Sequence, residues 1–304
     1  MDNVFQKICD IYPHYTLKSK LKKKFFYLIF TIFKFFLNGP IILNFGKFYF
    51  LAYPQKKNYS RSLLTKINFP DDNEVNFFID NIDKNSLFID CGANQGFYSI
   101  PIAGSHKDCE IYAFEPSNNE INDLKKNISI NNFKNIYTYD LAIADKEGKF
   151  KFKDDNIENH STKGGYIIDD PNINHKNISM VSATTLDKFI EKKKIKHNKK
   201  IFIKIDLEGY DINAIYGSTN LFNQYFTVIL FEFSRMMVGN KIYSNKNFNE
   251  FLNRNNLIIL DIKGKKLNLD ILHEKLNSLK KKYNVCGNFL IIKEKNLNYL
   301  KFRN

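Results

Sequence analysis

From Asp71 onward, the chain alternates segments of helical hydrophobic periodicity with short apolar runs typical of buried strands. Asp71 and Glu74 predict a capping box that opens a helix. The run from Ser86 to Asp90 predicts a buried strand that passes into a glycine turn at Gly92. Alternation of this kind is typical of a mostly parallel sheet with helices on both faces.

A second strand, residues 110–114, is predicted to end at Glu115. Ser117 and Glu120 form a capping box for the next helix. Further strands are predicted over residues 137–145, 201–209 and 227–231. A capping box at Thr184 and Asp187 opens another helix before residue 201.

The turn after the first strand has the chemistry of a nucleoside site. Gly92 and Gly96 allow a tight turn and a close approach of a ligand to the backbone. Glu115, at the end of the neighbouring strand, places a carboxylate where it can accept hydrogen bonds from both ribose hydroxyls. The spacing is not the G-x-G-x-x-G of proteins that bind the pyrophosphate of a dinucleotide. A nucleoside without phosphates therefore fits the turn better. Asp140 and Ala142, in the third strand, lie where adenine could be framed, unless Asp140 is simply solvated.

The segment from Ile201 to Gly209 alternates with period two. Its pattern places Lys204, Asp206 and Glu208 on one face of a strand and apolar residues on the other. The following strand also ends in an acid, Glu232. Charged side chains on a buried sheet indicate either a functional site or an internal ion pair.

The N-terminal residues form a separate pattern. Five lysines between Lys18 and Lys24 precede an apolar, aromatic run from Phe25 to Leu37. Thirteen helical residues rise about 20 Å, less than the roughly 30 Å of a bilayer core, so a single membrane span is disfavoured. A helix lying on an anionic membrane surface through residues 18–45 is favoured over a helix packed on the protein's own core. We therefore divide the chain into an N-terminal arm, residues 1–66, and a main α/β domain, residues 67–304.

Composition adds two constraints. The chain has 46 Lys and Arg against 32 Asp and Glu, a formal charge of +14. It is also rich in Asn, Ile and Phe, as an AT-rich genome produces, and its basic runs lack a base-stacking motif, which argues against nucleic acid as a partner. The four cysteines are far apart, with no C-x-x-C pair, which favours a reducing, cytoplasmic compartment.

Taken together, the motifs resemble the FkbM-type family of S-adenosylmethionine-dependent methyltransferases. The resemblance covers roughly Leu87 to Glu232, and Cys91 departs from it because the family usually has Ile or Val at that position. The matching segments, in order, are Asp90 to Gly96, Phe114 to Pro116, Thr185 to Asp187, Lys204 to Gly209, and Glu232.

The resemblance implies a class I, Rossmann-like α/β fold, with a seven-stranded, mostly parallel sheet and one antiparallel strand near its C-terminal edge. Residues 258–262 and 288–293 are the candidates for the last two strands. The implied cofactor is S-adenosylmethionine, with Glu115 on the ribose, and no metal is expected. The other implied cofactor-binding residues are Asp90, Gly92, Ala93, Asn94 and Gly96 in the turn, and Asp140 and Ala142 beside adenine.

For catalysis, we expect Asp206 to act as the base or to orient the acceptor, together with Lys204, Glu208 and Glu232. Two alternatives stay open: Lys204 and Asp206 form an ion pair without a chemical role, or the three acids bind a metal. Residues 153–177 are predicted to form a long loop of the kind that often covers a site. His160 in that loop is a further candidate base, although an exposed histidine is the more ordinary interpretation.

These expectations describe an O-methyltransferase that acts on a hydroxyl of a sugar or small metabolite, in surface-glycan biosynthesis. The enzyme would be cytoplasmic and peripheral to the inner membrane face. Two alternatives remain, an RNA ribose or cap methyltransferase and a non-catalytic, membrane-associated binding protein on the same fold. The sequence does not indicate the oligomeric state.

Overall fold

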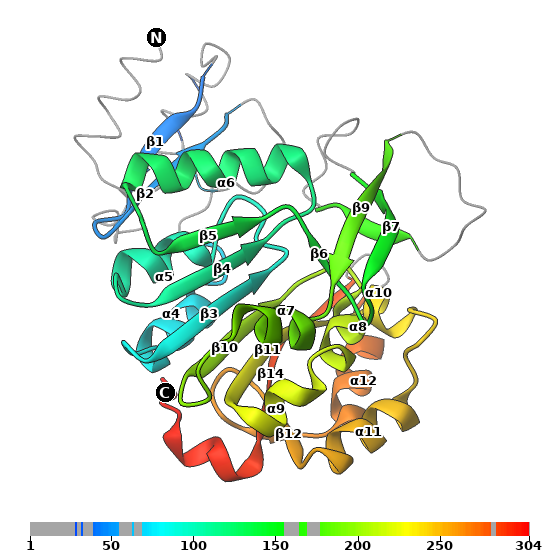
Figure 1. Ribbon diagram of the computed structural model, residues 1–304. Helices are drawn as coiled ribbons and strands as arrows, with labels where there is room; N and C mark the ends of the chain where they lie inside the picture. The colour runs from blue at the N-terminus through cyan, green and yellow to red at the C-terminus, as the bar shows by residue number, and fades with distance from the viewer. Residues whose placement is uncertain are drawn as a thin grey trace.

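The computed structural model describes residues 39–54, 69–154, 164–168, 177–280 and 284–303, together with Leu28, Ile32 and Leu63 (Figure 1). Within these residues, eight strands form a central sheet in the order β13-β12-β14-β11-β10-β3-β4-β5. The strands are β3 Ser86–Cys91, β4 Glu110–Phe114, β5 Ile136–Tyr139, β10 Lys200–Ile205, β11 Phe226–Ser234, β12 Leu257–Leu260, β13 Lys266–Leu267 and β14 Val285–Lys293.

The sheet confirms the predicted mostly parallel architecture. Strands β5, β4, β3, β10 and β11 are parallel, whereas β14 runs antiparallel between β11 and β12. β12 and β14 are the two strands predicted at the C-terminal end. The described sheet has one strand more than predicted, because the two-residue β13 pairs with the edge of β12.

Helices cover both faces of this sheet (Figure 1). Alternate strand residues divide between two cores, as period-two side chains must: Phe88 and Phe202 belong to one and Ile89 and Ile203 to the other. The first core includes residues of α4 Asp72–Asn81, α5 Ser99–Ser105 and α6 Asn118–Asn131. The second includes residues of α7 Leu186–Lys193, α8 Asp211–Tyr216, α9 Thr219–Gln224, α10 Arg235–Val238, α11 Asn245–Arg254 and α12 Leu269–Ser278. A 3₁₀ helix, Glu294–Tyr299, follows β14.

A second sheet corrects two predictions. The strand predicted over residues 137–145 is divided: β5 ends at Tyr139, and Ala142–Ile143 forms β6 of a four-stranded sheet. The loop predicted over residues 153–177 contains β8, which pairs with β7 of that sheet. These strands form because they pair with segments that are distant in the sequence, and such pairing cannot be read from local periodicity. The remaining bounds are β7 Gly148–Lys153, β8 Tyr166–Ile168 and β9 Ile178–Thr184.

An N-terminal hairpin packs on the α/β domain. Its strands, β1 Ile41–Asn44 and β2 Tyr49–Ala52, pair antiparallel, and Phe50 is fully buried in the core that also contains Leu124 of α6. The predicted boundary after residue 66 places this hairpin in the arm, but in the structure it belongs to the domain's core.

Helix caps only partly follow the predictions. Ser117 caps α6 by accepting a bond from the Glu120 N–H, as predicted. Asp71 makes no cap bond and lies in the left-handed region with φ 49°, so that capping box was wrong. The cap of α7 is Thr185, one residue after the predicted Thr184.

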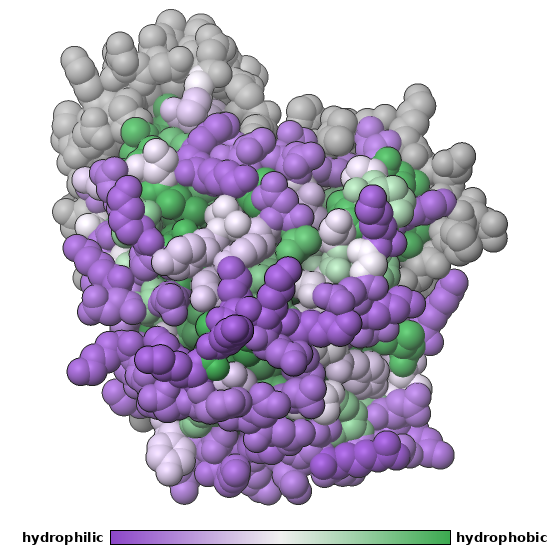
Figure 2. Space-filling model, in the orientation of Figure 1, coloured by the Kyte–Doolittle hydropathy of each residue, from purple (hydrophilic) through white to green (hydrophobic). Residues whose placement is uncertain are grey.

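The lysine-rich and apolar run of the N-terminal arm, residues 18–38, lies outside the described residues except for Leu28 and Ile32. Among the described parts of the chain, the longest helices are too short and too polar to cross a bilayer. Figure 2 shows one face of the molecule, on which hydrophilic residues predominate and hydrophobic residues form small patches between them.

Candidate functional site

The candidate site lies at the carboxyl edge of the parallel strands. Strand pairing aligns Phe231, Ile205, Cys91, Phe114 and Tyr139 across β11, β10, β3, β4 and β5. The residue that follows each of these occupies the same level of the sheet. This row is Glu232, Asp206, Gly92, Glu115 and Asp140, five residues that sequence reasoning had selected one by one.

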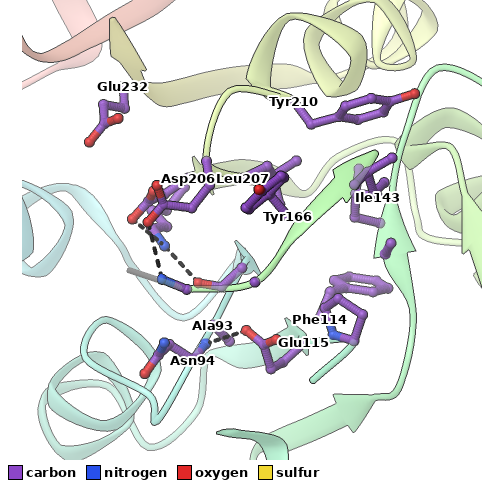
Figure 3. Close-up of a pocket in the computed structure, with 18 of the residues that line it drawn as sticks. Ala93, Asn94, Phe114, Glu115, Ile143, Tyr166, Asp206, Leu207, Tyr210 and Glu232 are labelled. Atoms are coloured by element: carbon purple, nitrogen blue, oxygen red, sulfur yellow. Dashed lines mark hydrogen bonds and ion pairs between the residues drawn. The ribbon is translucent and has the colours of Figure 1, made fainter. Parts of the chain in front are cut away.

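A pocket of about 960 Å³, including open solvent at its mouth, lies over this row. Figure 3 shows Asn94 and Glu115 in one part of the pocket and Asp206 and Glu232 in another. Because neighbouring strands are about 4.8 Å apart, Glu115 and Glu232, three strands apart, are separated by roughly 14 Å along the sheet. The turn and the acidic residues therefore line two different parts of the pocket.

The glycine turn after β3 is shaped by close packing. Gly92 has φ 75°, and a Cβ on it would lie 2.1 Å from the backbone oxygen of Asp206. Gly96 has φ 93°, and a Cβ there would lie 2.6 Å from Leu124. Glycine is favoured at both positions because φ is positive and a side chain would clash with Asp206, just after β10, or with Leu124 of α6. Gly92 lines the pocket, whereas Gly96 packs behind it.

Glu115 is buried at the end of β4. Its two carboxylate oxygens accept hydrogen bonds from the backbone N–H groups of Asn94 and Ser117, each at 2.9 Å. Burial raises the pKa of Glu115 to about 8, against the lowering effect of these two bonds. Because a carboxylate has about four acceptor positions, Glu115 keeps acceptor capacity for a ligand.

Lys204 joins the turn to the acidic part of the pocket. Its Nζ donates to the Gly92 carbonyl at 2.8 Å and lies 3.2 Å from Asp206 Oδ2 and 3.8 Å from Asp90 Oδ1. Burial alone would lower the pKa of Lys204, but Asp206 and Asp90 raise it above the ordinary value. Lys204 therefore remains charged although it is 5% exposed, while the Asp206 side chain is 41% exposed to the pocket.

The ion pair between Lys204 and Asp206, which was one of the two alternatives to a catalytic role, is thus present. Both residues line the pocket. Asp90 is different: it is fully buried and accepts bonds from the Ser99 N–H and hydroxyl at the start of α5. Asp90 does not line the pocket, and its contacts position Lys204 and α5 instead.

Glu208 and Glu232 extend the acidic wall. Glu208 does not continue β10 as predicted, because β10 ends at Ile205 and Glu208 lies in a turn with φ 51°. Its Oε1 accepts a bond from the Gly164 N–H at 3.2 Å. Burial raises the pKa of Glu232 to about 9, and the negative charges of Asp206, Asp211 and Glu208 add to the effect.

The pocket thus brings together nine of the twelve predicted site residues. Asp90, Gly96 and Asp140 are outside its lining. The nine are Gly92, Ala93, Asn94, Glu115, Ala142, Lys204, Asp206, Glu208 and Glu232.

Asp140 belongs to the row of residues at the edge of the sheet, but its side chain does not line the pocket. It is 59% exposed and forms an ion pair with Lys125 of α6 at 3.4 Å. The chain then turns back, and Leu141, Ala142 and Ile143 line the pocket. Ala142 therefore lines the pocket, whereas Asp140 does not.

Sequence reasoning missed several lining residues. Tyr98 follows the glycine turn and donates its hydroxyl to Asp71 Oδ2 at 3.0 Å, and both residues line the pocket. Asp71 precedes α4, and Tyr98 lies between the glycine turn and α5; the sequence pattern had indicated Asp71 only as a helix cap. The second sheet contributes Phe152, Tyr166 and Ile167. The last two lie in the loop that was predicted to cover a site, although no local pattern indicated a strand there. The candidate base His160 lies outside the described residues.

The metal alternative gains no support. Among the residues that the structure describes, no group of three or more His, Cys, Asp or Glu side chains is arranged to hold a metal ion. Asp206 is engaged by Lys204 and Glu208 by Gly164 instead.

The strand order, the glycine turn after β3 and the acid after β4 define a class I methyltransferase fold. A family model described as "Methyltransferase FkbM domain" matches residues 90–260, more than half of the chain. The chain therefore belongs to the FkbM methyltransferase family. No curated protein matches it in sequence.

Solved structures with similar architecture are distant in sequence. Methyltransferase FkbM from Methylobacillus flagellatus KT is 13% identical with a TM-score of 0.40, and the match covers 79% of this chain and 56% of that one. This chain therefore spans little more than half of that protein's length. TYW2 from M. jannaschii in complex with AdoMet is 13% identical, with a TM-score of 0.38 and coverage of 83% and 84%. SMU.1697c, a putative methyltransferase from Streptococcus mutans in complex with SAH, is 12% identical, with a TM-score of 0.38 and coverage of 75% and 99%.

Proposed function

We propose that the protein is an S-adenosylmethionine-dependent O-methyltransferase that acts on a hydroxyl of a sugar or small metabolite. The observation that carries the proposal is the row at the carboxyl edge of the sheet. It combines a glycine turn and Glu115 on one side with Lys204, Asp206 and Glu232 on the other, within one pocket. Cofactor and acceptor would occupy these two sides.

The turn side fits the cofactor. Glu115 retains acceptor positions for two ribose hydroxyls, as its two backbone bonds use only part of its capacity. Phe114, Ala142 and Ile143 offer apolar surface for a base. Gly92 and Ala93 leave backbone open to the methionine portion, because neither has a side chain beyond Cβ.

On the acceptor side, Asp206 is our first choice to bind the reacting hydroxyl. When bound, S-adenosylmethionine supplies an electrophilic methyl group; the acceptor oxygen forms the new O–C bond as the S–C bond breaks. Asp206 accepts the hydrogen bond of that hydroxyl and takes up its proton, and Lys204 holds the carboxylate in place. With its raised pKa, Glu232 is protonated at neutral pH and can donate a hydrogen bond to a second acceptor oxygen.

We place this activity in surface-glycan biosynthesis at the cytoplasmic side of the membrane. The support for this setting is the basic and aromatic N-terminal segment, which has the composition of a surface-binding helix. A lipid-linked sugar would then lie within reach of the pocket.

The test is calorimetric titration with S-adenosylhomocysteine of the wild type, Glu115→Ala and Asp206→Asn. We expect saturable binding by the wild type, at least a tenfold loss in Glu115→Ala, and less than a threefold change in Asp206→Asn. A folded wild type that fails to bind would refute the enzyme and favour a non-catalytic binding protein. Salt-sensitive retention of RNA would favour the nucleic-acid alternative.

A further inference from the structure

A short segment of the second sheet enters the acceptor side of the pocket. The Gly164 N–H donates to Glu208 Oε1 at 3.2 Å, and Tyr166 pairs in register with Lys153 of β7. Tyr166 lines the pocket, and Figure 3 shows it in the same part of the pocket as Asp206 rather than beside the glycine turn. Tyr166 therefore contributes an aromatic ring to the acceptor side, and the mechanism proposed above gives this ring no role.

The orientation of Tyr166 is fixed from two directions. Lys153 Nζ donates to the Tyr166 hydroxyl at 3.4 Å and lies 5.5 Å from the ring centroid, so it lies toward the hydroxyl end of the ring rather than over its centre. On the backbone side, Phe152 packs against Gly165, where a Cβ would lie 2.1 Å from Phe152 Cζ. Tyr166 is only partly buried, so part of its ring surface stays open to a ligand in the pocket.

Two other groups on the acceptor side offer hydrogen bonds more than net charge. The Asp206 carboxylate lies 3.2 Å from the Lys204 ammonium, which balances its charge. Burial raises the pKa of Glu232 to about 9, so Glu232 is protonated at neutral pH and can donate a hydrogen bond as well as accept one. This side of the pocket therefore combines an aromatic ring with hydrogen-bonding groups that suit neutral hydroxyls.

From these observations, and resting on the proposed methyltransferase function, we propose that Tyr166 binds the acceptor by stacking against the C–H face of a neutral sugar ring. A pyranose carries hydroxyls around the edge of its ring and C–H groups on its faces. Stacking on Tyr166 removes an apolar face from water, while the hydroxyls at the edge stay available to Asp206 and Glu232. A linear polyol has the hydroxyls without the face, and a phenol has the face with fewer hydroxyls, so both should bind less well.

The test exploits the lack of tryptophan in the chain. Tyr166→Trp keeps an aromatic surface and introduces a single tryptophan at the proposed contact. The variant is saturated with S-adenosylhomocysteine and titrated with the methyl glycosides of glucose, galactose, mannose and rhamnose, with sorbitol and with catechol. We expect at least one glycoside to change the tryptophan emission saturably and to bind at least tenfold more tightly than sorbitol or catechol.

Saturation-transfer NMR on the wild type repeats this comparison without the substitution. Failure of every glycoside to bind in both measurements, or tighter binding of sorbitol or catechol, would overturn the proposal.

Matched variants then test the ring itself. For the glycoside that binds best, Tyr166→Ala should weaken binding at least tenfold, whereas Tyr166→Phe should stay within threefold of wild type, because only the first removes the ring. The control is Tyr299→Ala, which removes a 71% exposed tyrosine from the 3₁₀ helix outside the pocket and should change nothing. Unchanged glycoside affinity in Tyr166→Ala would contradict the stacking.

Cofactor affinity separates this proposal from the proposed function. All three variants should bind S-adenosylhomocysteine within twofold of wild type. Loss of cofactor affinity in Tyr166→Ala would assign Tyr166 to the cofactor side and overturn its role with the acceptor. Loss of S-adenosylhomocysteine binding by the wild type would instead refute the proposed function itself.

Discussion

Gly92 illustrates at the scale of one residue how the site depends on close packing. Its positive φ and the 2.1 Å gap between an added Cβ and the Asp206 backbone oxygen mean that no side chain fits. The same close approach lets the Gly92 carbonyl accept the bond from Lys204. The close approach of β10 to the turn therefore both excludes a side chain at Gly92 and brings its carbonyl within hydrogen-bond distance of Lys204.

Gly92→Ala should lower the free energy of unfolding by about 2 kcal/mol or more, because the methyl group is both strained and overpacked. Urea denaturation measures the change. Gly39→Ala is the matched control, since nothing lies within 4 Å of a Cβ at that position. It should change stability by less than about 0.5 kcal/mol. Equal effects of the two variants would contradict the packing argument.

Glu115 should make cofactor binding depend on pH. The pKa of Glu115 in the free protein is raised to about 8, so it is mostly protonated at pH 6.5. Ribose hydroxyls donate to the ionised form, and binding therefore releases a proton below pH 8. S-adenosylhomocysteine affinity should rise roughly tenfold between pH 6.5 and 8.5 and level off above this range.

Calorimetry in buffers of different ionisation enthalpy measures this proton release directly. Glu115→Gln is the control, because it cannot ionise, and its weaker binding should be nearly independent of pH. A wild type with the same flat profile would show that Glu115 does not bind the ribose as a carboxylate.

At the scale of elements, side chains of α6 form a ladder along β2. The N–H groups of Tyr49 and Leu51 donate to the side chains of Asn131 and Asn127, and the Tyr53 hydroxyl donates to Asp123. Two strand residues advance about 6.6 Å and four helical residues about 6.0 Å, so the periods nearly match. The hairpin is therefore held by α6 at every second residue of its strand.

Asn127 also connects this ladder to the glycine turn. Its Oδ1 accepts from the Leu51 N–H at 2.8 Å, and its Nδ2 donates to the Gln95 carbonyl at 2.9 Å. Asn127→Ala leaves both backbone groups buried without their partners and should cost about 2 to 4 kcal/mol in urea denaturation. Asn131→Ala, at the partly exposed end of the ladder, should cost about 1 kcal/mol or less. A reversed order of the two variants would refute the proposed bridge.

At the scale of the whole molecule, the hairpin and the residues before it should be separable in function. Ile41 and Leu43 of β1 and Phe50 and Ala52 of β2 are buried in the same core as α4 and α5. Removal of residues 1–40 should preserve this core and S-adenosylhomocysteine binding, while releasing the protein from anionic vesicles. Removal of residues 1–54 should destabilise the domain strongly, because it exposes that core.

Vesicle co-sedimentation, thermal unfolding and calorimetry of the two truncated proteins check this prediction. The control is wild-type protein with neutral vesicles, which should bind weakly. If the shorter truncation loses cofactor binding as well, the arm belongs to the catalytic core rather than to a membrane-binding element.

What the sequence determined by itself was the central sheet and the row of residues on it. Apolar runs such as Leu87 to Ile89 identified the buried strands, and acids or glycines that follow them, such as Glu115 and Gly92, were placed at their ends. Because parallel strands end at one edge, these local signals also predicted that distant residues converge. Nine of the twelve predicted side chains do line one pocket.

Only the tertiary structure decided which of those residues face the ligand. Asp140 pairs with Lys125, Asp90 is enclosed beside Lys204, and Tyr166 enters the pocket on a strand that pairs with β7. These outcomes depend on contacts between segments that are far apart in the chain. Such contacts produce no periodic pattern in the local sequence, so they could not be predicted from it. The position of Lys204 between Asp206 and Asp90 follows from the same long-range packing and not from composition.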